Sequence, residues 1–196
     1  MNSSNTTKKI IIFASGQGSN AKNIIHYFRD RNDVEISHVL SNNIKANVLK
    51  MAHDHEINAL HFDRSALYNS NEVLHILKDT DPDLIVLAGF LWIMPTEIIQ
   101  EFENKIINIH PALLPKYGGK GMYGNYVHQA VLENKEKETG ITIHFVNEKY
   151  DEGKTISQFS TEVAPNETLE SLKEKIHQLE HKHFPEVIDQ LLSAEK

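Results

Sequence analysis

Apolar runs alternate with amphipathic segments along the first half of the chain. The runs are rich in Ile, Val, Leu and Phe and lie at 8–15, 34–43, 59–62, 84–90 and 106–110. The segments between them are predicted to be helical, at 21–31, 46–57, 71–83 and 95–102. Strands that alternate with helices pair in parallel through crossover connections, and the helices then cover the sheet. The pattern therefore predicts an α/β fold, a mostly parallel, Rossmann-like open sheet with helices on both faces.

The second half of the chain follows a different pattern. A stretch rich in proline and glycine at 111–124 precedes a predicted helix at 124–134. Residues 140–146 and 156–163 alternate apolar and polar positions, as an antiparallel C-terminal strand pair does. Residues 166–192 are predicted to be helical, with an interruption at Pro185. Neither a repeat nor a linker divides the sequence, so we predict one domain over residues 1–196.

The composition is typical of a soluble globular protein, with 24% charged and 40% hydrophobic residues. The formal net charge of -7 and the lack of a basic block argue against nucleic acid as a partner. The absence of cysteine excludes disulfides and thiolate chemistry. The apolar stretch 84–94 is too short to cross a bilayer. The first nine residues, MNSSNTTKK, lack the apolar core of a signal peptide, and we interpret them as a short disordered lead-in. We therefore expect a cytoplasmic protein that does not act at a membrane.

A glycine turn follows the first predicted strand. Residues 16–21, GQGSNA, fit the G-x-G-x-x-[GA] spacing between a strand and a helix, where free N–H groups favour a phosphate. The next strand ends in Asn42 and Asn43, where a dinucleotide site would carry an acidic residue. Ser19 and Asn20 instead suit a phosphate monoester, because they add side-chain donors to the backbone ones. A turn without a ligand and a dinucleotide site remain the alternatives.

Asn108 and His110 lie two residues apart at the end of a predicted strand, so both side chains point to the same face. Pro111 stops the strand there, and ligands of open parallel sheets collect beyond the carboxyl ends of strands. An asparagine amide can stabilise an oxygen that becomes negative, and a histidine can move a proton near neutral pH. This pair suits direct acyl transfer to an amine. Alternatively, Asn108 and His110 have a structural role and bind the backbone of the following loop. A carboxylate near His110 would favour the catalytic role. Asp151 is the candidate for this carboxylate, although the sequence alone also allows it to be a simple turn former.

Four motifs carry a resemblance to a known family: FASGQGSN, AGFLWIM, NIHPALLPKYGG and the YDEG turn after ITIHFV. The chain resembles the folate-dependent formyltransferases, and most closely those members that act on phosphoribosylglycinamide. The resemblance implies transfer of the formyl group of 10-formyltetrahydrofolate to the amine of 5'-phosphoribosylglycinamide in de novo purine (IMP) biosynthesis, with no metal. It also implies a Rossmann-like phosphate-binding half at 8–105 and a catalytic and folate-binding half at 106–196.

The resemblance also implies roles for individual residues. Asn108 matches the asparagine that binds the formyl oxygen, His110 the catalytic histidine, and Asp151 the aspartate that tunes it. The implied contacts of the phosphoribosyl group are Gly18, Ser19, Asn20, His177, Gln178, Leu179 and Glu180. Arg64 lies one place from a family arginine that contacts the acceptor. The implied folate contacts are Leu91, Trp92, Ile93, Met94, Asn147, Glu148, Lys149, Tyr150 and Asp151, with Trp92 standing where many relatives carry arginine.

Other interpretations of the sequence stay open. A formyltransferase with another amine acceptor, such as a sugar nucleotide, and a formyltetrahydrofolate hydrolase share the central motif. A non-catalytic nucleotide-binding module would use only the glycine turn. Residues 177–181 spell H-x-x-E-H, a zinc-peptidase pattern, but a polar histidine-rich helix face explains them better than a metal does. The expected partners are small-molecule substrates, and the expected assembly is a monomer or a homodimer.

Overall fold

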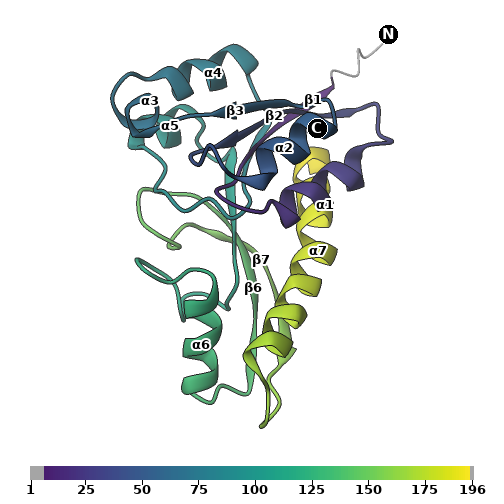
Figure 1. The fold of residues 1–196 in the computed structure, drawn as a ribbon, viewed down its shortest axis with the longest axis vertical. Coiled ribbons are helices and arrows are strands. Elements are labelled where there is room, and N and C mark those ends of the chain that lie inside the picture. The colour runs from purple at the N-terminus through teal and green to yellow at the C-terminus, as the bar shows by residue number, and fades with distance from the viewer. Residues whose placement is uncertain (1–6, 195–196) are drawn as a thin grey trace.

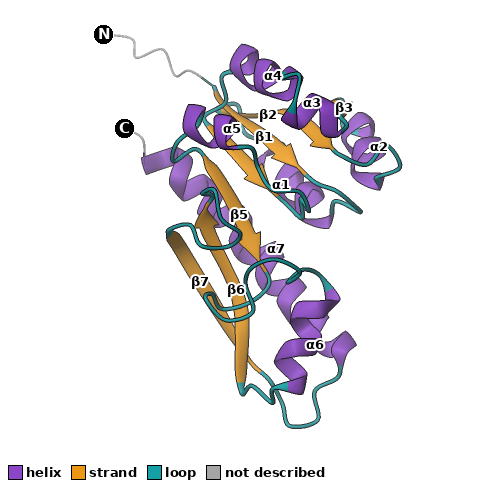
Figure 2. Cartoon of the chain, turned by 90° about the vertical axis from the view of Figure 1, so that its left-hand side faces the viewer, coloured by secondary structure: helices purple, strands orange, loops and turns teal. Residues whose placement is uncertain are grey.

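The computed structural model describes residues 7–194, and its central feature is one seven-stranded sheet in the order β3-β2-β1-β4-β5-β6-β7 (Figures 1 and 2). Five strands run parallel: β1 (Lys8–Phe13), β2 (Val34–Ser41), β3 (Asn58–His61), β4 (Leu84–Leu87) and β5 (Ile106–His110). Strand β6 (Glu138–Phe145) pairs antiparallel with both β5 and β7 (Thr155–Glu162). The predicted fold class is confirmed. Residues 1–6 of the predicted disordered lead-in lie outside the described residues.

Seven helices cover the sheet within residues 7–194. They are α1 (Ser19–Phe28), α2 (Asn47–Asp54), α3 (Arg64–Tyr68), α4 (Glu72–Thr80), α5 (Thr96–Glu101), α6 (Asn125–Glu133) and α7 (Leu169–Ala194). The short helix α3 was not among the predicted elements, because its five residues are too few to show a helical period. None of the helices in the described part of the chain is long and apolar enough to cross a membrane.

The alternating side chains of β1 divide the core into two layers. Ile10 and Ile12 belong to a buried cluster with residues of α1, α2 and α7, and Ile11 and Phe13 belong to a second cluster with residues of α3, α4 and α5. All four side chains are fully buried. A strand whose two faces are both covered must be apolar at every position, which is the pattern that the sequence shows. This packing holds the carboxyl end of β1, and the glycine turn after it, in a fixed place.

The expected interruption at Pro185 is wrong, because α7 continues through the proline from Leu169 to Ala194. A proline has no N–H group, so the carbonyl of His181, one turn earlier, loses its helical partner. The side-chain amide of Asn23 in α1 donates to this carbonyl at 2.6 Å. The hydrogen bond satisfies the free carbonyl and ties α7 to α1.

Candidate active site

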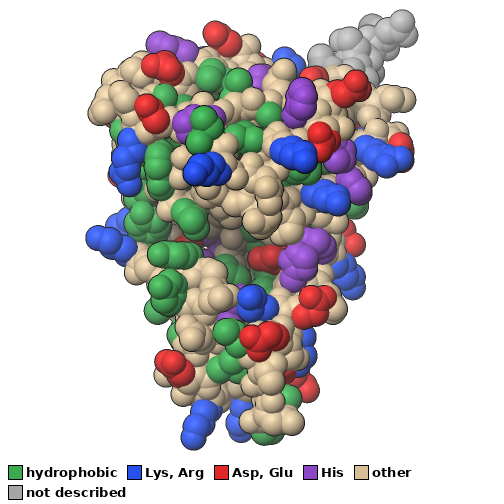
Figure 3. Space-filling model, in the orientation of Figure 1, with side chains coloured by type: hydrophobic (Ala, Val, Ile, Leu, Met, Phe, Trp, Pro, Cys, Tyr) green, Lys and Arg blue, Asp and Glu red, His purple; other side chains and the backbone are tan. Residues whose placement is uncertain are grey.

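A cavity of about 890 Å³ opens beyond the carboxyl ends of β1, β4 and β5. The glycine turn and β5 line one side of it, and the loop before α6 and one face of α7 line the other. Figure 3 shows the hollow near the middle of the molecule. The predicted phosphoribosyl contacts that line the cavity are Gly18, Ser19, Asn20, His177 and Glu180.

Two residues predicted for the same group point elsewhere. The Gln178 side chain is exposed and donates to Glu174, and Leu179 packs against the core. They lie between His177 and Glu180 in the sequence, but successive residues of a helix face different directions. Of the four residues 177–180, only His177 and Glu180 therefore reach the cavity.

The glycine turn brings the start of α1 to the cavity. Gly18 adopts a left-handed conformation with φ 78°, and a Cβ atom there would collide with the side chain of Val48 in α2. No side chain caps the first turn of α1, which begins at Ser19. The first N–H groups of the helix are therefore free for an anion.

A buried amide and a carboxyl link the two walls of the cavity. The amide nitrogen of Asn20 in α1 donates to Glu180 Oε2 in α7 at 3.0 Å. Although Glu180 faces the cavity, protein encloses most of its carboxyl, and this burial raises the pKa to about 7 against the opposing effect of the Asn20 hydrogen bond. The carboxyl therefore changes its protonation near neutral pH.

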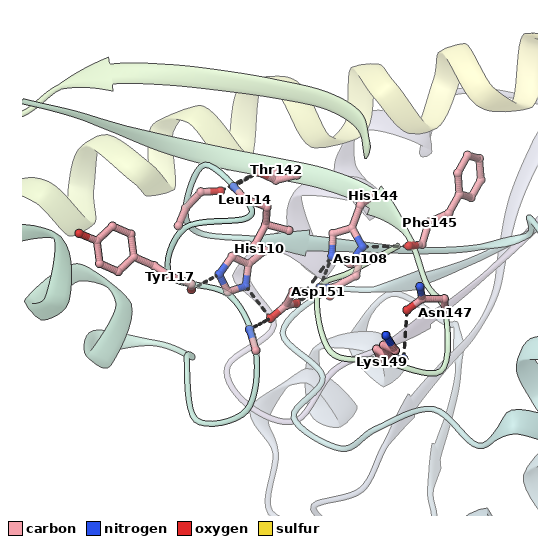
Figure 4. Close-up of polar contacts among 12 residues, drawn as sticks. Asn108, His110, Leu114, Tyr117, Thr142, His144, Phe145, Asn147, Lys149 and Asp151 are labelled. Atoms are coloured by element: carbon pink, nitrogen blue, oxygen red, sulfur yellow. Dashed lines mark hydrogen bonds and ion pairs between the residues drawn. The ribbon is translucent and has the colours of Figure 1, made fainter. Parts of the chain in front are cut away.

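The polar side chains at the end of β5 converge on Asp151 (Figure 4). Asp151 Oδ2 lies 3.5 Å from His110 Nδ1 and accepts from the Gly119 N–H at 2.9 Å. Its Oδ1 lies 3.5 Å from Asn108 Nδ2 and 3.7 Å from His144 Nε2. The sequence prediction that Asn108, His110 and Asp151 belong together thus agrees with their positions.

The turn after β6 explains how Asp151 reaches this place. Gly153 lies so close to the Phe145 carbonyl that a Cβ atom there would overlap it, so the chain can fold back tightly only with glycine. The Phe145 N–H also donates to the Lys154 carbonyl at 2.9 Å. Asp151 itself has φ 54°, and aspartate tolerates this left-handed conformation better than most residues.

His110 has a polar neighbour at each ring nitrogen. Its Nε2 lies 2.8 Å from the carbonyl oxygen of Tyr117, and a carbonyl can only accept, so Nε2 carries the proton and Nδ1 faces Asp151. Burial lowers the pKa of His110, while Asp151 and the Tyr117 carbonyl raise it in part. The neutral ring can therefore take a proton at Nδ1 and form an imidazolium beside the Asp151 carboxylate.

Asp151 is suited to stay ionised in this position. Burial by itself would raise its pKa, but the contact with His144, the charge of His110 and the Gly119 N–H together lower the pKa below its ordinary value. The carboxylate is thus available to stabilise the imidazolium form of His110.

His144 is the main residue that the sequence analysis missed. It lies directly opposite Asn108 in the β5–β6 ladder, and Asn108 Nδ2 is 3.1 Å from its Nε2. The other ring nitrogen, Nδ1, lies 2.9 Å from the Phe145 carbonyl, which assigns the proton to Nδ1 and leaves Nε2 to accept from Asn108. The alternation of residues 140–146 gave no signal for it, because His144 takes a polar position of the strand, which in the structure is buried.

A smaller cavity adjoins the larger one, and Asn108 and Asp151 line both. Those predicted folate contacts that line the smaller cavity are Trp92, Ile93, Met94, Asn147, Lys149, Tyr150 and Asp151. Leu91 lines the larger cavity instead, and Glu148 lines neither. The two segments predicted to bind folate therefore face each other across one small space.

Arg64 does not reach the larger cavity. Its guanidinium lies 4.8 Å from the ring centre of Trp92 and 5.9 Å from that of Tyr68. The structure thus places Arg64 beside the segment predicted to bind folate, and not beside the residues predicted to bind the phosphoribosyl group.

The family model described as formyl transferase matches residues 8–188, and the chain belongs to this family. It is 34% identical over 190 residues to phosphoribosylglycinamide formyltransferase of Bacillus subtilis, with 94% of this chain and 95% of that protein covered. It is 37% identical over 187 residues to the chloroplastic enzyme of that name from Arabidopsis thaliana, covering 92% of this chain and 64% of the relative. The chain thus spans less than two thirds of that plant relative.

A solved structure agrees with the sequence relatives. The crystal structure of phosphoribosylglycinamide formyltransferase from Bacillus halodurans has a TM-score of 0.86 and 32% sequence identity to this chain. The comparison covers 96% of this chain and 97% of that one. The sheet and its connections are therefore shared over nearly the whole length.

Proposed function

We propose that this chain transfers the formyl group of 10-formyltetrahydrofolate to the amine of 5'-phosphoribosylglycinamide in purine biosynthesis. The observation that carries the proposal is the group of Asn108, His110 and Asp151, which lies where a large cavity meets a smaller one. A transferase that joins two substrates needs such a meeting point. Relatives named for this activity, which align over most of the chain, support the proposal.

The larger cavity suits the phosphoribosyl acceptor. The free N–H groups at the start of α1 would hold the phosphate, and the Glu180 carboxyl would accept from ribose hydroxyls. Within residues 7–194, the buried Asn20 Oδ1 and His128 Nδ1 have no hydrogen-bond partner, and both residues line this cavity. Buried polar atoms are nearly always hydrogen-bonded, so these two atoms favour a polar ligand in the cavity.

The smaller cavity suits the folate co-substrate. Apolar side chains from the segment after β4 and residues of the turn after β6 would line one edge of a flat ring system, because this cavity, of about 70 Å³, holds only part of such a ligand. Asn108 and Asp151, which line both cavities, would then lie next to the formyl carbon. Trp92 and Arg64, which stack on each other at one edge, would lie toward the remainder of the folate.

The proposed reaction needs no covalent enzyme intermediate. The acceptor amine attacks the formyl carbon and a C–N bond forms, while the Asn108 amide donates to the formyl oxygen that becomes negative. A well-placed donor of this kind contributes about 3 kcal/mol to the transition state. His144 orients the Asn108 amide through the 3.1 Å contact between Asn108 Nδ2 and His144 Nε2.

His110 handles the proton in this scheme. Its Nδ1 accepts the proton of the attacking amine, and the imidazolium is stabilised by Asp151 at 3.5 Å. The proton then passes to the folate nitrogen as the bond from that nitrogen to the formyl carbon breaks. The products are the formylated amine and tetrahydrofolate, and the enzyme returns to its starting state.

A spectrophotometric assay with a 10-formylfolate analogue tests the proposal. We expect deformylated folate to form only when phosphoribosylglycinamide is present, and His110→Ala to reduce the rate by about 100-fold or more. His61→Ala is the matched control, since His61 is exposed on β3 and lines neither cavity. Folate turnover without the acceptor would identify a hydrolase, and binding of NAD(P) without folate binding would identify a nucleotide-binding module.

The broader expectations from the sequence stand as part of this proposal. We assign the phosphate site mainly to residues 8–105 and catalysis and folate binding mainly to residues 106–196, although Glu180 and residues 91–94 cross that division. A cytoplasmic location and a monomeric or homodimeric state complete the proposal. Size-exclusion chromatography with light scattering tests the assembly.

A further inference from the structure

Two histidines meet on the surface outside the proposed active site. His26 in α1 and His55 at the end of α2 approach with their Nε2 atoms 3.3 Å apart and their ring centres 5.4 Å apart. His26 is exposed, His55 is half-buried, and neither lines the two cavities described above. Figure 3 shows histidine side chains on the face that carries these helices.

The spacing of the two nitrogens matches that of two ligands on one metal ion. Tetrahedral Zn²⁺ binds imidazole nitrogens at about 2.0–2.1 Å, which places two such nitrogens about 3.3–3.4 Å apart. In the metal-free protein a proton occupies this position, in an N–H···N hydrogen bond of 3.3 Å from His26 to the unprotonated Nε2 of His55. With the proton removed, the spacing of the two nitrogens suits a cation that accepts electron pairs from both rings.

The surroundings of His55 also fit a metal ligand. Its Nδ1 lies 2.8 Å from the Met51 carbonyl, which can only accept, so Nδ1 carries the proton. The lone pair of Nε2 then points toward His26. Metal-binding histidines commonly donate their other ring N–H to a backbone carbonyl in this way, which fixes the tautomer and the ring orientation.

We propose that His26 and His55 form a surface site for a divalent first-row transition metal ion, with Zn²⁺ as the representative ion. Within residues 7–194 no group of three or more His, Cys, Asp or Glu side chains could hold a metal, so water completes the coordination. The site is separate from catalysis, which needs no metal.

A metal ion bound here would join α1 to α2. These two helices flank the glycine turn: the Val48 N–H of α2 donates to the Gly16 carbonyl at 3.2 Å, and Asn47 donates to Gln17. The ion would therefore stabilise the packing that positions the phosphate end of the cavity. Because it binds only the folded arrangement of the two rings, it raises the melting temperature.

Calorimetric titration of the tag-free protein with ZnCl2 tests this site. We expect the protein to bind one equivalent of Zn²⁺ saturably. His26→Ala and His55→Ala should each weaken the binding by more than about tenfold, because loss of a residue that only hydrogen-bonds to a metal ligand can already weaken binding by that much. His53→Ala is the matched control, because His53 is an exposed histidine two residues from His55. Zn²⁺ should raise the melting temperature of the wild type and of the control, but not of the two ligand variants.

Several outcomes would overturn the proposal. They are the absence of saturable binding, equal binding by all four proteins, and a loss in only one of the two ligand variants. Binding that is instead lost in His177→Ala would place the metal on α7 and also reject this site. Competition gives a further check, because Cu²⁺ should displace Zn²⁺ whereas Mg²⁺, which prefers oxygen ligands, should not.

Discussion

Glu180 offers a test of the electrostatics of the cavity through protein stability. Its pKa is raised from 4.5 to about 7 by burial, so the folded state binds a proton that the unfolded state has lost. The protein then gains stability from Glu180 at pH below 4.5, and this stability is lost as the pH rises through the interval from 4.5 to about 7. Glu180→Gln removes the titration while it keeps an oxygen that can accept from Asn20.

The size of the effect follows from the shift. A shift of roughly 2.5 pKa units corresponds to about 3 kcal/mol, and roughly 2.5 kcal/mol of this change falls between pH 5 and pH 8. The carboxyl faces a cavity that water can fill, and water screens the charge, so we take this value as an upper limit. We expect the wild type to lose about 1–2.5 kcal/mol more than Glu180→Gln between these two pH values.

Urea denaturation of the substrate-free protein at pH 5 and pH 8 measures this difference. The quantity to compare is the change in the free energy of unfolding between the two pH values, in the wild type and in Glu180→Gln. Glu170→Gln is the control, since Glu170 is an exposed glutamate of the same helix. The same pH dependence in the wild type and in Glu180→Gln, or a steeper loss in the variant, would refute the reasoning.

Three further predictions concern the active site and its supports. Asp151→Asn removes a charge that raises the pKa of His110, so the acidic limb of the pH profile of kcat/KM should move to lower pH, and an unmoved limb would contradict the pairing. Gly18→Ala should destabilise the protein by about 1–3 kcal/mol and raise KM for the acceptor, because φ is 78° and α2 occupies the space of a Cβ. Gly16→Ala, whose Cβ would meet no atom within 4 Å, is the control for stability and should have little effect in the same melts. Asn23→Ala should lower the free energy of unfolding by about 1 kcal/mol, because it leaves the carbonyl one turn before the proline of α7 without its donor. Urea denaturation measures this loss, and unchanged stability would show that water replaces the amide.

Local patterns in the sequence were sufficient to predict much of the fold. Strands buried on both faces must be apolar throughout, and helices on a sheet must carry an apolar stripe, so the alternation of such segments indicates a parallel sheet. Backbone geometry also determines that Asn108 and His110 share one face of a strand end. The fold class and the position of these two residues could therefore be predicted without the structure.

The tertiary structure decided what the local patterns could not. The sequence showed that residues 140–146 belong to an antiparallel pair, but only the sheet order places β6 beside β5 and sets His144 opposite Asn108. The continuity of α7 through Pro185 likewise depends on an amide from α1, which lies 158 residues away from the carbonyl it satisfies.

The two walls of the cavity also differ in whether the sequence or only the tertiary structure reveals them. The glycine turn can be recognised in six consecutive residues, because the turn and the helix start are local features. Glu180 belongs to the site only because Asn20, 160 residues earlier in the chain, lies against it in the folded protein. Periodicity and turn chemistry follow from the bonding of neighbouring residues, whereas the raised pKa of Glu180 and the orientation of Asn108 arise from burial and contacts that exist only after the chain has packed.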